Sequence, residues 1–129
     1  MKPFLGDAAP FEPADSKNFV GRARVKRFPL VQGNQPVIVY LVEFEAGCRT
    51  NWHVHSAPQL LLVKQGRGLV QKWGEPVQHI AAGDAITIDP QEKHWHGASA
   101  DTPMSHFAVN LNLTTEWLEP VSDEQYRAS

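Results

Sequence analysis

The sequence contains almost no cysteine and no long apolar segment. Its 129 residues include one cysteine, Cys48, so an internal disulfide is excluded. The first 18 residues hold no apolar stretch of the length that a signal peptide or a membrane span requires. These absences predict a cytoplasmic protein that does not work inside a membrane.

The charge of the chain is nearly balanced. Twelve Lys and Arg residues stand against fourteen Asp and Glu residues, which gives a formal net charge of −2, and neither sign forms a run. This distribution predicts neither a nucleic-acid surface nor a membrane anchor, and it favours a small molecule as the partner. The 42% hydrophobic content is sufficient for the core of one domain.

The order of residue types predicts an all-β fold. Residues 1–18 are rich in proline and polar residues, which indicates an irregular N-terminal arm, and residues 19–129 are expected to form a single domain. Runs rich in Val, Ile, Leu and aromatic residues alternate with Gly, Pro, Asn and Asp, as in a small antiparallel barrel or jelly roll. The clearest predicted strands are 37–44, 59–65, 68–73, 85–89 and 105–113.

Three local predictions complete this outline. The segment from Gly66 to Gly68 should form a turn between two of the strands. A short C-terminal helix is expected at most, within 115–118 or 123–127. Cys48, beside a strand, is expected to be a small packing residue and not a nucleophile.

Five of the six histidines fall in three short windows. His53 and His55 are two residues apart, as are His94 and His96, and His106 follows on a third predicted strand. Side chains two apart on a strand share one face, so each pair should point the same way. Gln59 has the parity of the first pair if its strand resumes after Pro58, whereas His79 stands alone and is expected in solvent.

The histidine pattern predicts a divalent transition-metal site. An isolated histidine is usually a surface or core residue without a ligand, but two pairs and a fifth residue on strands of one barrel favour metal binding. Three imidazoles and one oxygen donor suit Mn, Fe, Ni, Cu or Zn better than Ca or Mg. Gln59 is expected to supply the oxygen, although it could instead form a hydrogen bond within the barrel.

The spacing of these residues resembles the two motifs of the cupin family. Gly47, His53, His55, Gln59 and Gly66 have the spacing of the first motif, with Gln59 where a glutamate is usual. Gly83 and His94 have the spacing of the second motif, although three of its turn residues are replaced: Asp89 stands for proline, Gln91 for glycine and Ala98 for asparagine. The resemblance spans about 37–113 and implies the cupin β-barrel.

The resemblance also implies the ligands and a reaction. The residues at the family's metal-binding positions are His53, His55, Gln59 and His94. The segment 92–110, with the tail after it, is similar to small bacterial cupins that are manganese-dependent hydroxynitrile lyases and also use a glutamine ligand. It therefore implies a manganese-dependent lyase that cleaves or forms cyanohydrins. Small cupins usually form dimers, so a homodimer is expected, with the arm crossing to the second copy.

The amide of Gln59 suits such a reaction. An ion held by three neutral imidazoles and an amide keeps its full +2 charge, so it is a stronger Lewis acid than one with a carboxylate ligand. This favours reactions in which the ion polarises a substrate over reactions in which the ion changes its oxidation state. His96 and His106 are the candidate catalytic residues, because a neutral imidazole can act as a general base, although either could instead orient a ligand.

The expected pocket walls follow from the same parity. Leu61 and Val63 share the parity of Gln59, and Ala108 and Asn110 share that of His106. Tyr40 and Val42 form one face of 37–44 together with Phe44, but the opposite face is equally apolar, so the inward face stays open. The four tryptophans, at 52, 73, 95 and 117, are expected to pack in the core or at a dimer interface.

Three other functions fit the same residues. An Fe(II) dioxygenase would use a similar site and consume oxygen. A sugar-acid isomerase would need a cation in the pocket. The available cations are Lys64, Arg67 and Lys93, of which only Lys93 is next to a predicted ligand. A non-catalytic binding module would need only the cavity, since fold does not fix function.

Overall fold

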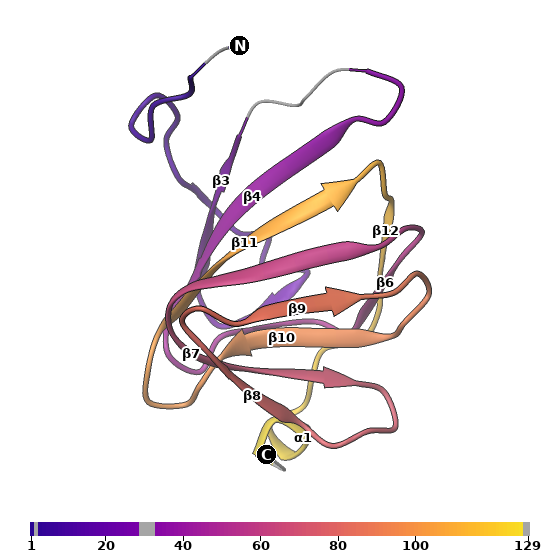
Figure 1. The fold of residues 1–129 in the computed structure, drawn as a ribbon. Helices are drawn as coiled ribbons and strands as arrows, with labels where there is room; N and C mark the ends of the chain where they lie inside the picture. Colours follow the sequence, from indigo (N-terminus) through magenta and orange to yellow (C-terminus); the bar gives the residue numbers. More distant parts are fainter. Residues whose placement is uncertain (2, 29–32, 128–129) are drawn as a thin grey trace.

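The computed structural model describes residues 1, 3–28 and 33–127, which form twelve strands and one short helix (Figure 1). The strands are β1 (Glu12–Pro13), β2 (Phe19–Val20), β3 (Ala23–Arg27), β4 (Val37–Phe44), β5 (Arg49–Thr50), β6 (His53–His55), β7 (Gln59–Lys72), β8 (Gln78–Ala81), β9 (Ala85–Ile88), β10 (His94–Ala98), β11 (Met104–Leu111) and β12 (Thr115–Trp117), and the helix is α1 (Asp123–Arg127).

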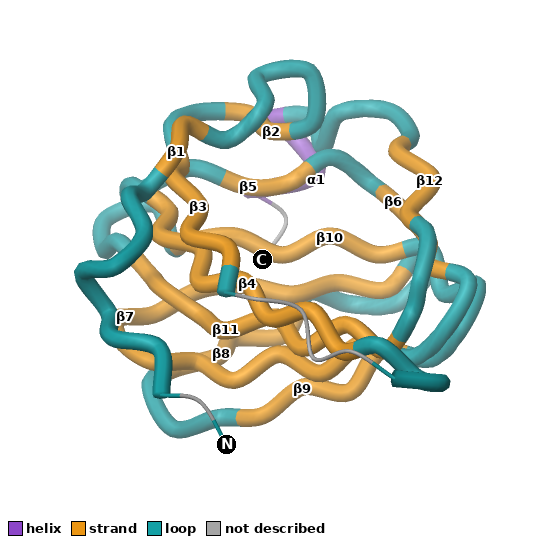
Figure 2. The backbone as a smooth tube through the Cα atoms, turned by 90° about the horizontal axis from the view of Figure 1, so that it is seen from above, coloured by secondary structure: helices purple, strands orange, loops and turns teal. Residues whose placement is uncertain are grey.

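The strands form two antiparallel sheets that curl around a common interior (Figure 2). The first sheet has the order β1-β3-β4-β11-β7-β9, and we call it sheet A. The second, sheet B, has the order β8-β7-β10-β5-β2, with β6 also paired to β10 and β12 paired to β6. The expected all-β antiparallel barrel is confirmed.

Strand β7 belongs to both sheets, and here the sequence prediction was wrong. The predicted turn at Gly66–Gly68 is a bend within one continuous strand of 14 residues. Gly66 has a φ of 81°, and a Cβ at this position would collide with the carbonyl oxygen of Pro103. The bend lets the first half of β7 pair with β11 and β9 and the second half with β10 and β8.

The register of β4 and β11 shows which face of β4 points inward. Val42 lies opposite His106, and Phe44 lies opposite Met104. Residues directly opposite in an antiparallel pair share a face, so the face of β4 that carries Val42 and Phe44 is the one turned toward the histidines. This settles the choice between faces that the apolar run 37–44 left open.

The C-terminal segment differs in part from the prediction. Residues 123–127 form the expected short helix, but Thr115–Trp117 forms strand β12 and not a helical turn. A helix over 115–118 would be a single turn and would gain little stability, because the first turn of a helix is costly to form. Pairing with β6 instead satisfies the backbone of a segment that contains a β-branched and an aromatic residue.

The segment after β12 covers the outer face of sheet B. Its residues Val121 and Tyr126 pack with Trp52, Leu69 and Trp95 in a separate apolar cluster. The Tyr126 hydroxyl donates a hydrogen bond of 2.6 Å to the carbonyl oxygen of Ala98, at the end of β10. The strand that carries two histidines is thus supported from outside the barrel.

In the described part of the N-terminal arm, the only strand is β1, which pairs with β3 of the same chain. The Arg24 guanidinium lies 4.0 Å from the centre of the Phe11 ring, which holds the arm against sheet A. The crossing of the arm to a second copy stays a prediction. Among the described residues, no helix has the length and apolar character needed to span a membrane.

Candidate metal centre

Six predicted site residues meet inside the barrel, although they come from four strands. Each is buried, with an exposed fraction of at most 6%. They are His53 and His55 on β6, Gln59 at the start of β7, His94 and His96 on β10, and His106 on β11. The alternation of side chains places Trp95, between two of them, on the opposite face of β10, where it packs in the outer cluster.

The imidazoles lie close enough to share an ion. The His53 and His94 ring centres are 4.2 Å apart, and the His55 ring lies 5.0 Å from the first and 5.1 Å from the second. His96 follows at 5.4 Å from His53, and its Nδ1 lies 3.0 Å from His106 Nε2. All five rings therefore form one contiguous cluster.

Backbone carbonyls fix the tautomers of two candidate ligands. Nδ1 of His53 lies 2.8 Å from the Asn51 carbonyl oxygen, and Nδ1 of His94 lies 2.8 Å from that of Glu92. A carbonyl oxygen only accepts, so Nδ1 carries the proton and Nε2 keeps its lone pair. His94 Nε2 is buried without a hydrogen-bond partner. A buried lone pair without a partner fits a metal ligand.

His55 and Gln59 form a second pair of donors. His55 Nε2 lies 3.1 Å from Gln59 Oε1, and Gln59 Nε2 donates a hydrogen bond of 2.7 Å to Asn110 Oδ1. Asn110 thereby turns the amide so that its oxygen faces the imidazoles. The Thr115 hydroxyl lies 2.9 Å from His55 Nδ1. Because a hydroxyl both donates and accepts, it can serve either tautomer of His55, including the one that frees Nε2 for a metal.

The cluster offers two overlapping sets of ligands. One ring nitrogen from each of His53, His94 and His96 lies within 4.8 Å of the others, and this group could hold a divalent metal ion. The resemblance implied His55 with Gln59 in place of His96. His53 and His94 are common to both sets, so either site depends on these two residues.

Burial keeps the cluster neutral near pH 7. Desolvation lowers the pKa of His94 and that of His106 to about 4. It is also the largest cause that lowers the pKa of His53, His55 and His96, and neighbouring imidazoles add to it for His53 and His96. Neutral imidazoles can bind a metal ion or accept a proton without first losing one.

These shifts predict that the metal-free protein loses stability in mild acid. The unfolded chain binds protons at its histidines below about pH 6.5, whereas the folded chain keeps His94 and His106 neutral down to about pH 4. The free energy of unfolding should therefore fall from pH 7 to pH 5 by about 2 kcal/mol for each of the two. Urea unfolding at both pH values measures it, and His106→Asn should show the smaller fall. Equal stability at both pH values would contradict the expectation.

The predicted wall residues surround the cluster as core residues. Leu61 and Ala108 pack with Ile88 in one group, and Val42 and Val63 belong to the main core. Tyr40, which is half-buried, contacts both groups. Asn110 has a more specific position than predicted, because its side chain holds the amide of Gln59. These apolar groups border the histidines, and a small cavity of about 130 Å³ reaches His94.

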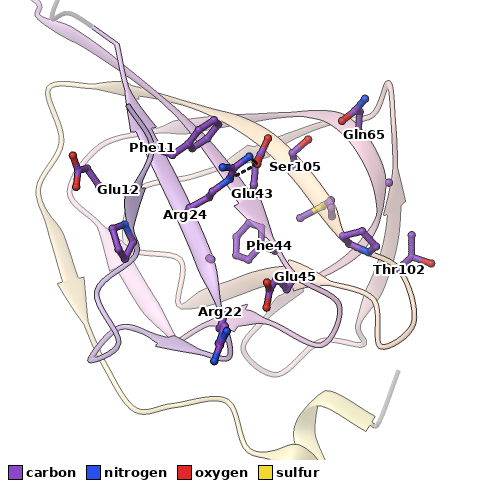
Figure 3. Close-up of a pocket in the computed structure, with 15 residues that line it drawn as sticks. Phe11, Glu12, Arg22, Arg24, Glu43, Phe44, Glu45, Gln65, Thr102 and Ser105 are labelled. Carbon is purple, nitrogen blue, oxygen red and sulfur yellow. Dashed lines mark hydrogen bonds and ion pairs between the residues drawn. The ribbon is translucent and has the colours of Figure 1, made fainter. Parts of the chain in front are cut away.

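The larger described cavity lies elsewhere, at the end of the barrel near β1, β3 and β4 (Figure 3). Its volume is about 710 Å³, and it is lined by residues such as Phe11, Arg22, Pro103 and Met104, without a histidine. Phe44 connects the two regions. Its side chain lines this cavity and also contacts the His106 ring, with centres 5.2 Å apart, and the His96 ring, at 5.9 Å.

Other residues singled out in the sequence lie outside the cluster. The Lys93 ammonium contacts Glu119 at 2.8 Å and the Trp73 ring centre at 3.6 Å. His79 is exposed on β8, as expected. Cys48 packs in the core, where burial raises its thiol pKa to about 12.

Sequence reasoning missed two neighbours of the cluster. Thr115 holds His55, and Trp117 lies against His53 with ring centres 4.6 Å apart. Both lie on β12, for which a helix was expected. These two residues are two positions apart, as on one face of a strand, but this spacing does not show that β6 is the partner strand.

The fold and this cluster define a class of protein, the small β-barrels with a histidine-lined metal centre. Comparison with known sequences agrees, because the profile of the cupin domain matches residues 40–110. The chain belongs to the cupin family, as its motifs indicated.

Individual relatives resemble most of the chain. An (R)-mandelonitrile lyase from Granulicella tundricola is 43% identical over 114 residues, which are 84% of this chain and 86% of the relative. A cupin-like protein from Thermotoga maritima has a TM-score of 0.82 and 35% identity, over 89% of this chain and 90% of its own. A polyketide cyclase from Streptomyces resistomycificus shares the fold, with a TM-score of 0.75 at 13% identity over 98% of this chain and 91% of its own.

Proposed function

We propose that the protein is a metal-dependent lyase that cleaves or forms cyanohydrins. The observation that carries the proposal is the cluster of buried neutral imidazoles around one amide oxygen. The relative named a mandelonitrile lyase supports the same reaction at 43% identity. Mandelonitrile, which splits into benzaldehyde and hydrogen cyanide, is therefore the first substrate to test.

The residues fit a divalent ion, with manganese as the first choice. His53, His55, Gln59 and His94 would hold it, because they offer three ring nitrogens and an oxygen without a negative charge. When bound, the ion supplies Lewis acidity to a substrate oxygen. His55 Nε2 and Gln59 Oε1, which lie 3.1 Å apart, would both turn toward such an ion.

The pair of His96 and His106 supplies the base. Its nitrogens lie 3.0 Å apart in the buried cluster, and both rings are neutral near pH 7 because burial lowers the pKa of each. In the proposed cleavage, an imidazole of this pair takes the hydroxyl proton of the cyanohydrin. The bond between the carbinol carbon and the nitrile carbon breaks, its electrons leave with cyanide, and the proton then passes to cyanide. The products are an aldehyde and hydrogen cyanide.

One observation bears on the isomerase alternative. That function needs a cation in the pocket, and Lys93 is held outside the histidine cluster by Glu119 and Trp73. The Fe(II) dioxygenase would instead consume oxygen during turnover. A flat oxygen trace while benzaldehyde is released would separate the lyase from it.

The test of the proposed function is the removal and return of the metal. Protein treated with a chelator and then dialysed should release benzaldehyde from mandelonitrile no faster than buffer does. One equivalent of Mn²⁺ should restore the rate, because the ligands are neutral and preassembled. Benzaldehyde absorbance reports the rate, and the same amount of free Mn²⁺ without protein is the control. Full activity in the metal-free protein would refute the proposal.

A further inference from the structure

Three aromatic side chains form a continuous contact chain along the histidine cluster. The Trp117 ring lies 4.6 Å from that of His53, and the Phe19 ring lies 6.1 Å from Trp117. Phe19 also lies 5.9 Å from Phe44, whose ring contacts His106 at 5.2 Å. We call Phe19, Phe44 and Trp117 the aromatic arc. Its two ends touch different imidazoles of the cluster, His53 and His106.

The aromatic arc runs from the surface to the buried site. Trp117 is 38% exposed, Phe19 is half-buried and Phe44 is 2% exposed, whereas no histidine of the cluster is more than 5% exposed. A substrate that reaches the imidazoles must displace side chains that cover them. Trp117 is both exposed and in contact with His53, so it is a covering side chain that a molecule from solvent can touch first.

We propose that the aromatic arc is a binding subsite for a planar aromatic ring, and that Trp117 selects such a ring over an aliphatic group of equal size. The ligand class is an alcohol or aldehyde whose functional carbon is attached to an aryl ring. The ring rests on Trp117 and Phe19 while the oxygen reaches the histidine cluster. This subsite rests on the proposed function only for the identity of the reacting group.

The physical basis is the geometry of aromatic contacts. Aromatic rings attract one another in tilted and edge-to-face arrangements with centres between about 4.5 and 7 Å apart, beyond the effect of buried area alone. The rings of the arc meet at interplanar angles of 41° and 43°, which are tilted arrangements that leave ring faces and edges for another ring. A saturated ring has no such electrostatic pattern, so it would gain only the apolar contact.

The structure also offers space for the ring to enter. Phe44 lines the cavity of about 710 Å³ at the end of the barrel, and Figure 3 shows its ring among the residues that surround this space. In the proposed subsite, Phe44 shifts toward this cavity and makes room beside His106.

Binding of two alcohols tests the subsite without requiring turnover. Benzyl alcohol and cyclohexylmethanol carry the same number of non-hydrogen atoms and one hydroxyl, but only the first has an aromatic ring. Each is titrated into the metal-loaded protein, and isothermal titration calorimetry gives the dissociation constant. Benzyl alcohol should bind about fivefold tighter than cyclohexylmethanol. Trp117→Leu should reduce this ratio to about one, and Trp117→Phe should keep most of it.

Matched variants complete the experiment. Trp73→Leu removes another exposed tryptophan, 50% exposed and in contact with Trp52, and should leave the ratio unchanged. Phe19→Leu offers a second test of the arc if Trp117→Leu does not fold, with the ratio measured by the same titration. A ratio near one in the unaltered protein, or an equal loss of both alcohols in Trp117→Leu, would overturn the subsite. Selective binding without benzaldehyde release from mandelonitrile would refute the lyase and leave the subsite standing.

Discussion

Replacement of His94 by alanine should remove both the metal ion and the lyase activity. His94 Nε2 is a buried nitrogen without a hydrogen-bond partner among the described residues, and His94 belongs to both possible ligand sets. Metal content should fall from about one equivalent per chain to less than about a tenth, because ligand count decides affinity. Elemental analysis by mass spectrometry and the mandelonitrile assay measure the two losses.

His79→Ala is the matched control, since His79 is exposed on β8 and should lose neither metal nor activity. Far-ultraviolet circular dichroism shows whether each variant folds. The same measurement on His55→Ala and His96→Ala separates the two ligand sets. Loss of metal in His55→Ala alone supports the ligands implied by the cupin motif. Loss of metal in His96→Ala alone would show that His96 replaces His55 as a ligand. A His94→Ala protein that keeps its metal would refute both sets.

Replacement of His106 by glutamine should abolish most of the turnover while the metal stays bound. His106 is fully buried beside His96, and glutamine can keep a hydrogen bond there but cannot take a proton at neutral pH. Loss of a general base lowers kcat by about 10²- to 10⁴-fold. Steady-state rates of benzaldehyde release, together with metal content, measure the effect.

Two outcomes would exclude His106 as the base. A kcat within about threefold of the unaltered protein would leave no room for proton transfer at this residue. Loss of the metal in His106→Gln would instead show that His106 acts by holding His96 in place as a ligand. His96→Gln is the matched variant, because a hydrogen bond joins His96 and His106.

Alternation along strands made much of the fold and the cluster predictable. His53 and His55, and likewise His94 and His96, lie on one face of their strands because side chains alternate, whatever the sheet around them. Strand β4 was predicted with its observed bounds. The inward face of β4 could not be read, because both faces are apolar and only the register with His106 distinguishes them.

The errors arose where distant residues decide the local structure. Gly66 bends β7 without ending it because Pro103 approaches its backbone, and sequence spacing alone does not show that approach. Thr115 and Trp117 form a strand because β6, about 60 positions earlier, offers a partner. Both residues contact the histidine cluster, so the wrong prediction for this segment also hid part of the site.

The donors of the site come from β6, β7, β10 and β11, whereas β4 has a different part. Four of the histidines come from β6 and β10 of sheet B, whereas Tyr40, Val42 and Phe44 come from β4 of sheet A and supply wall but no donor to the cluster. Strand β4 is paired on both sides, with β3 and β11, so its backbone is well supported. For redesign, this makes β4 the strand on which the shape of the pocket can be varied while the chemistry is left in place.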